Sequence, residues 1–157
     1  MSVALQLSEA IGDWDFSISV LAYHLASLVV AFLLALPVAW DREQLKNSPG
    51  LRTFPLVAMA SCAYVLVVSS IADGDPSANS RMLQGLATGI GFIGGGAILK
   101  DGSSLRGTAT AAGIWTMGAL GSAVAFRRLE IAILLALVTF GTLRWLKPFK
   151  AHDEEES

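Results

Sequence analysis

The sequence has little cysteine and little charge, and each scarcity excludes a class of protein. Cys62 is the one cysteine in 157 residues, so the chain can form neither an internal disulfide framework nor a zinc site built on cysteine pairs. Charged residues make up 15% of the chain, against about 25% in a typical soluble domain. The net charge of −2 gives no reason to expect nucleic acid as a partner.

Motifs of enzyme chemistry are also missing from the sequence. It contains no His-Glu-x-x-His zinc motif, no Walker lysine motif and no recognisable Ser-His-Asp arrangement. A Gly-x-Gly-x-x-Gly string occurs at residues 89–94, but it lies inside an apolar run rather than after a strand, so it does not predict a dinucleotide site. We therefore expect a protein that is not an enzyme and that carries no cofactor or metal.

Long apolar runs are what the sequence has instead. Hydrophobic residues make up 54% of the chain, and the mean hydropathy is +0.58. A membrane-spanning helix needs about 20 predominantly apolar residues. The runs predict one all-α domain over residues 17–146, a polytopic transmembrane bundle of about five helices. The predicted helices cover residues 17–40, 56–72, 83–99, 108–126 and 131–146.

The distribution of lysine and arginine predicts how this bundle is oriented. Alternate connections divide the positive residues into a larger group of Arg42, Lys46, Arg52, Lys100, Arg106, Arg144, Lys147 and Lys150, and a smaller group of Arg81, Arg127 and Arg128. Positive residues are retained on the cytoplasmic side. Segment 1–16 is therefore predicted to be extracytoplasmic, and the acidic tail 147–157 cytoplasmic. Segment 1–16 has no lysine or arginine, unlike the basic start of a signal peptide, so we expect no cleavage.

Glycine is concentrated in the predicted helix 83–99. The residues concerned are Gly85, Gly89, Gly91, Gly94, Gly95 and Gly96. Small residues four apart let helix backbones approach closely in lipid. One interpretation is a tight hairpin between helices 83–99 and 108–126 at the centre of the bundle. The other is a glycine-broken helix whose freed carbonyls face a polar cavity. With Gly107 and Thr110, these glycines form the predicted surface for helix packing or for a partner.

A short charged segment, Asp41–Arg42–Glu43, follows the first predicted helix. At a helix end such charges can reach headgroups or neighbouring polar groups. They either set the topology at the interface, or Asp41 or Glu43 pairs with Arg52, Lys100 or Arg106 at a cytoplasmic vestibule. The segment 100–107 is typical of a turn, and Thr108 and Thr110 are candidate caps of the helix that follows.

Two ordered blocks of sequence resemble a known family. Residues 39–43 (Ala-Trp-Asp-Arg-Glu) and 49–53 (Pro-Gly-Leu-Arg-Thr) resemble the Gly-x-Glu/Asp-Arg-Glu and Gly-Leu-Arg-Thr blocks of the MgtC/SapB membrane family. Residues 89–96 and 106–115 resemble its glycine-rich second block and the Arg-Gly-Leu-Thr-Thr-Ala-Ala segment with its tryptophan. Ala39 stands in place of the usual glycine, and Thr108–Ala109 in place of Leu-Thr.

The resemblance implies a bacterial inner-membrane protein of the short form, without the soluble C-terminal domain of longer members. Some members are linked to growth in low magnesium and to survival inside host cells, which associates the family with virulence. In one branch the family implies a regulator that acts on the proton-translocating ATP synthase. The functional polar cluster expected on these grounds consists of Asp41, Arg42, Glu43, Arg52, Thr53 and Arg106.

Two functions follow as hypotheses. In the first, the chain is a non-enzymatic regulator in the lipid bilayer that uses its glycine-rich helices to bind another membrane protein or to form a homodimer. In the second, it is a small ion or solute transporter that oligomerises around a pathway formed by a glycine-broken helix. Five short helices are few for a complete transporter, which favours the regulator.

Overall fold

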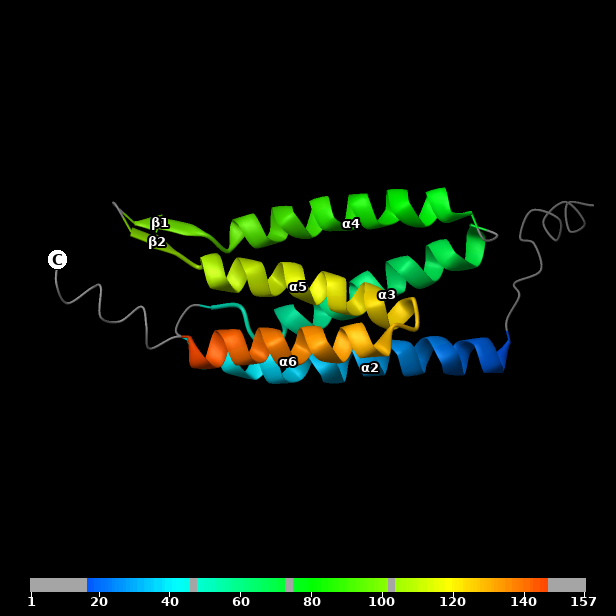
Figure 1. The fold of residues 1–157 in the computed structure, drawn as a ribbon, viewed down its shortest axis with the longest axis horizontal. Coiled ribbons are helices and arrows are strands. Elements are labelled where there is room, and N and C mark those ends of the chain that lie inside the picture. The colour runs from blue at the N-terminus through cyan, green and yellow to red at the C-terminus, as the bar shows by residue number, and fades with distance from the viewer. Residues whose placement is uncertain (1–16, 46–47, 73–74, 102–103, 147–157) are drawn as a thin grey trace, which may run out of the picture.

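The computed structural model describes residues 17–45, 48–72, 75–101 and 104–146. Within them the chain forms five α-helices and one short β-hairpin that run back and forth along a common long axis (Figure 1). The elements are α2 (Ile18–Glu43), α3 (Thr53–Ile71), α4 (Pro76–Gly96), β1 (Leu99–Asp101), β2 (Ser104–Arg106), α5 (Thr108–Ala125) and α6 (Leu129–Trp145). The predicted fold class, a five-helix bundle, is confirmed.

Helix α5 occupies the centre of this bundle and packs against each of the other four helices. The largest fully buried side chains include Phe54 of α3 and three residues of α5, Ile114, Met117 and Leu120. Close packing around α5 brings the ends of helices that are distant in sequence together. One of these ends carries the candidate site.

Two helices, α2 with 26 residues and α3 with 19, are each long and apolar enough to cross a membrane. The outside of the bundle is apolar as well. On α6, for example, Leu134, Leu137 and Val138 are each at least 60% exposed. Such a surface suits lipid rather than water. The crossing of the bilayer by α4, α5 and α6 stays a prediction.

Four helix ends differ from the predicted bounds by three residues or more: the end of α2, the start of α3 at Thr53 instead of residue 56, the start of α4, and the end of α4 at Gly96 instead of residue 99. Helix α2 continues past Trp40 through Asp41–Arg42–Glu43, because two of these three charged residues are buried and partnered. Helix α4 begins at Pro76, seven residues earlier than predicted. Asp75 caps it by accepting a hydrogen bond from the Ser77 N–H at 2.8 Å, and proline is well suited to the first turn.

The segment between α4 and α5 contains more than the expected turn. Strands β1 and β2 pair antiparallel, with Leu99 opposite Arg106 and Asp101 opposite Ser104. The hairpin extends beyond the ends of α4 and α5 (Figure 1). Helix α4 itself is continuous from Pro76 to Gly96, so the prediction of a glycine-broken helix is wrong. A continuous helix satisfies the backbone hydrogen bonds that lipid cannot satisfy.

Candidate functional site at the shared end of α2, α3, α5 and α6

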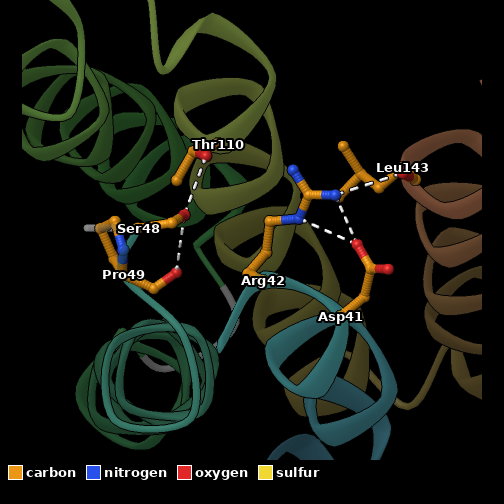
Figure 2. Close-up of polar contacts among 6 residues, drawn as sticks. All are labelled: Asp41, Arg42, Ser48, Pro49, Thr110 and Leu143. Carbon is orange, nitrogen blue, oxygen red and sulfur yellow. Dashed lines mark hydrogen bonds and ion pairs between the residues drawn. The ribbon is translucent and has the colours of Figure 1, made fainter. Parts of the chain in front are cut away.

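Asp41 and Arg42 form a buried ion pair in the last turn of α2. Their side chains are 2% and 4% exposed. The Arg42 Nε donates to Asp41 Oδ2 at 3.1 Å, and the Arg42 Nη2 donates to the same oxygen (Figure 2). A buried charge is costly unless it is paired and hydrogen-bonded. The two neighbours neutralise each other, so α2 can end inside the bundle.

Arg42 also joins α2 to the last helix of the bundle. Its Nη2 donates a hydrogen bond to the Leu143 carbonyl oxygen at 3.2 Å (Figure 2). Leu143 lies in the last turn of α6, where the carbonyl groups have no partner within the helix and attract a positive charge. The guanidinium therefore caps α6 and pairs with Asp41 at once.

Glu43, the third charged residue, binds the start of α3. Its Oε2 accepts a hydrogen bond from the Leu51 N–H at 2.9 Å, two residues before α3 begins. A carboxylate is favourable at this positive end of a helix. Gly50 lies so close that an added Cβ would overlap the Glu43 carboxylate and stand 2.7 Å from the Glu43 Cα. The absence of a side chain at Gly50 is what allows the approach.

Ser48 and Thr110 connect the α2–α3 segment to the first turn of α5. Their hydroxyl oxygens are 3.2 Å apart, and Thr110 is buried (Figure 2). The prediction that Thr108 or Thr110 caps α5 is wrong. The cap position is occupied by Gly107 in the left-handed region, with φ +86°, and no side chain caps the helix there. A Cβ on Gly107 would overlap the Ala97 carbonyl oxygen, which leaves glycine as the residue that fits.

The remaining members of the predicted polar cluster lie at the same end of the bundle but outside these contacts. Arg52 precedes α3 and Arg106 ends β2; both are exposed, and Thr53 is half-buried as the first residue of α3. Within the described residues, neither arginine forms an ion pair. Asp41 and Glu43 therefore do not pair with Arg52 or Arg106, and the side chain of Lys100, the third predicted partner, lies outside the described part of the structure.

The glycines of α4 divide into one that packs and five that do not. Gly94 is buried, and a Cβ there would lie 3.2 Å from the Ala111 carbonyl oxygen of α5. For the other five, an added Cβ would meet no atom within 4 Å in the described part of the chain; these are Gly85, Gly89, Gly91, Gly95 and Gly96. Helices α4 and α5 do pack together, as the hairpin interpretation predicts. Of the six glycines of α4, however, Gly94 alone makes the close contact with α5 that this interpretation expected.

The glycines that permit close packing lie on α5 instead. A Cβ on Gly121 would overlap the Ala58 carbonyl oxygen of α3, and one on Gly118 would overlap Ile90 of α4. At Gly113 a Cβ would lie 2.9 Å from the Phe54 ring. Helix α5 therefore uses its small residues inside the bundle, while α4 presents most of its glycines to the outside.

Electrostatics at the opposite end of the bundle centre on the α4 cap. The Ser77 hydroxyl and N–H both donate to Asp75, and these hydrogen bonds hold the pKa of the Asp75 carboxyl below its usual range. The Arg81 Nη2 lies 3.6 Å from the Asp75 Oδ2, and its positive charge lowers this pKa further.

Among the residues that the structure describes, no three histidine, cysteine, aspartate or glutamate side chains gather where they could hold a metal ion.

Sequence reasoning missed two participants in the site, the Leu143 carbonyl and Ser48. A backbone carbonyl leaves no trace in a sequence beyond the end of a helix, and Ser48 is one serine in a polar connection. The presence of Arg144 in the last turn of α6 was the nearest available signal, because it marks that end as one that favours cations.

The apolar exterior and the two helices that are long enough to cross a membrane indicate a helical membrane protein. Comparison with known proteins is more specific. The model of the MgtC family matches residues 28–152, and the chain belongs to this family. No solved structure matches it.

Several curated relatives share this similarity. The chain is 41% identical over 101 residues to protein MgtC of Brucella abortus, covering 64% of this chain and 42% of the relative. It is 33% identical over 136 residues to the Synechocystis protein slr0014, covering 85% and 57%. It is 35% identical over 136 residues to protein SrpB of Synechococcus elongatus, covering 78% and 72%. The chain thus spans about half the length of the first two.

Proposed function

We propose that this protein is a non-enzymatic regulator or accessory protein of the bacterial inner membrane, which acts by binding a second membrane-embedded chain through the outward face of α4. The observation that carries this proposal is the exposure of Gly91 and Gly95, which lie one turn apart on the same side of α4. Glycine lowers the stability of a helix interior by about 1 kcal/mol relative to alanine. In lipid, this loss of stability is offset when another helix packs closely against the glycines.

Polar residues on α4 support the same surface. Gln84 and Thr88 are exposed, and with Gly91 and Gly95 they occupy positions i, i+4, i+7 and i+11 of the helix. Residues so spaced share one face of a helix. The Gln84 side chain makes no hydrogen bond within the described residues, and an amide in a membrane span gains from a partner on a neighbouring helix. This face therefore suits another helix better than lipid.

The described arginines support the predicted topology. Arg42, Arg52, Arg106 and Arg144 belong to the end of the bundle where α2 and α6 finish, whereas Arg81, Arg127 and Arg128 belong to the other end (Figure 1). The end richer in lysine and arginine is proposed to be cytoplasmic. A multi-pass protein with its N-terminus outside and its C-terminus inside follows.

Family resemblance supplies the proposed physiological setting. Adaptation to low magnesium, intracellular survival and modulation of the F-type ATP synthase are proposed for this chain on that resemblance. A homodimer is the other proposed partner of the α4 face.

The test of the α4 face is site-specific crosslinking in bacterial membranes. Gly91→Leu and Gly95→Leu place a large side chain on the face at positions where an added Cβ meets no atom of the described bundle within 4 Å. We expect both to abolish the crosslink to the partner chain while the protein still inserts and folds. Ala26→Leu, at an exposed position of α2, is the matched control and should leave the crosslink intact. Equal crosslinking in the wild type and in all three variants would show that the α4 face does not bind the partner chain.

A transporter is the competing function. It was predicted to use a broken helix as its pathway, and the structure shows no such break in α4. Helix α4 is unbroken, and Arg42 already neutralises Asp41. Flux of Mg²⁺ and of H⁺ into liposomes, measured separately with the folded, inserted protein, decides between the two. We expect no flux above empty liposomes. Flux that Asp41→Asn abolishes would overturn the regulator and make the buried pair part of a permeation site.

A further inference from the structure

At the end of the bundle opposite the buried ion pair, three segments border an open hollow of about 320 Å³. Its polar lining comes from Tyr23 and His24 of α2, Ser69 and Ser70 of α3, and Arg127 of the α5–α6 turn. Leu66, Ala125 and Phe126 line the rest. Because no aspartate or glutamate is among the lining residues, Arg127 leaves the hollow with an excess of positive charge.

Arg127 occupies a position that normally belongs to glycine. Its φ is +60°, and it is the one residue other than glycine with a positive φ in the described part of the chain. The N–H of Arg127 bonds the Val124 carbonyl at 3.0 Å, and that of Arg128 bonds the Ala123 carbonyl at 2.9 Å. This is the Schellman pattern that ends many helices, in which glycine is the usual left-handed residue. An arginine in this place puts its side chain into the hollow despite an unfavourable backbone.

The arginine is held in place by Tyr23. The Arg127 Cζ lies 4.8 Å from the centroid of the Tyr23 ring, and its Nε donates to the Tyr23 hydroxyl at 3.3 Å. The Tyr23 O–H remains available as a donor, and so do the terminal nitrogens of the guanidinium. Ser69 and His24 make no hydrogen bond of their own within the described residues. Hydrogen-bond donors from three segments thus border one hollow, and no carboxylate is among its lining residues.

We infer that this hollow binds a phosphate group, with the phosphodiester of a phospholipid headgroup as its occupant. A guanidinium with adjacent hydroxyl donors matches the geometry and charge of phosphate oxygens. The apolar residues at its base, Leu66 and Phe126, would lie against the glycerol and the first acyl carbons. The hollow lies toward the end of the bundle where α2 begins and α3 ends, which is where the headgroup layer would lie in the transmembrane arrangement proposed above.

The experiment is native mass spectrometry of the full chain in detergent, titrated with phosphatidylglycerol, with diacylglycerol of the same acyl chains, or with inorganic phosphate. We expect one tightly bound phosphatidylglycerol and no comparable binding of diacylglycerol. Loss of a charge-assisted contact in Arg127→Gln should weaken binding about tenfold or more. Arg127→Lys should retain part of the affinity, and Tyr23→Phe should weaken it while keeping the ring.

Arg128→Gln is the matched control, because Arg128 is adjacent and exposed but lies outside the lining of this hollow and pairs with Glu130 at 3.1 Å. Binding in this variant should stay within about twofold of the wild type, since an exposed pair contributes little. Inorganic phosphate bound with the same variant pattern would assign the site to soluble phosphate esters. Equal weakening by Arg127→Gln and Arg128→Gln, or equal binding of diacylglycerol, would overturn the phosphate site. If Arg127→Gln fails to fold, Tyr23→Phe replaces it as the test, and binding of phosphatidylglycerol equal to that of the wild type would then overturn the phosphate site.

Discussion

The guanidinium of Arg42 donates a hydrogen bond at 3.2 Å to the carbonyl oxygen of Leu143, a residue 101 positions later in the chain. The same guanidinium pairs with its neighbour Asp41. One side chain therefore compensates a buried carboxylate and an unpartnered helix end, and it fixes α2 against α6. The stability of the bundle should depend strongly on it.

Replacement of Arg42 by methionine should lower the free energy of unfolding by about 3–5 kcal/mol, because it removes the cation that pairs with the buried Asp41 carboxylate. Thermal unfolding of the protein in detergent micelles measures the change. Arg52→Met is the control: Arg52 is exposed and forms no ion pair in the described residues, so its loss should stay within about 0.5 kcal/mol. Similar stability of the two variants would contradict a structural role of the pair.

Two glycine substitutions should have opposite outcomes. Gly121→Ala forces a Cβ onto the Ala58 carbonyl and should destabilise the fold by about 1–3 kcal/mol or more. Gly95→Ala adds a Cβ in open space and should be neutral or stabilising by up to about 1 kcal/mol, since alanine favours a helix. Unfolding curves of the two variants, recorded side by side, make the comparison. A loss of stability in Gly95→Ala would show that α4 packs differently.

Glu43→Ala should destabilise the start of α3 by about 0.5–1 kcal/mol, because the Leu51 N–H loses its acceptor. Glu43→Gln keeps an acceptor oxygen and should cost less. Hydrogen exchange at the Leu51 amide reports the contact directly and should accelerate in the alanine variant. Unchanged protection in Glu43→Ala would mean that the carboxylate is dispensable for this turn.

The α4 cap should depend on pH in a defined direction. The pKa of Asp75 is lowered in the folded protein by its hydrogen bonds from Ser77, so its contribution to stability is complete above the unfolded pKa of about 4. It is lost as the pH falls further, through the lowered folded pKa. Amide exchange in the first turn of α4, corrected for intrinsic rates, should therefore rise below about pH 4 in the wild type. Asp75→Asn should remove this pH dependence.

Much of the fold follows from the sequence because lipid exposure makes helices visible as apolar runs. Five runs gave five helices, and α2 exceeds its run only by the three charged residues that close it. The start of α4 was predicted too late because its first two turns are polar, and a search for apolar runs does not detect polar turns. Asp75 followed by Pro76 was the better indicator, since that pair is typical of a helix start.

The site could be predicted in composition but not in its contacts. The sequence brings Asp41, Arg42 and Glu43 together by adjacency, whereas their partners depend on the packing of distant helices. Nor does a list of glycines say which way each one faces. Gly94 and Gly95 are neighbours in sequence, yet one packs against α5 and the other is open, because successive residues of a helix point about 100° apart.

The pairing of Arg42 with its immediate neighbour has a consequence for biosynthesis. Asp41 is available as soon as α2 has been made, whereas Leu143 is added after about a hundred more residues. The arginine can thus be neutralised locally while the first helix enters the bilayer alone. Its bond to α6 cannot form until Leu143 has been synthesised, so this contact joins the first helix to the last only when the chain is nearly complete.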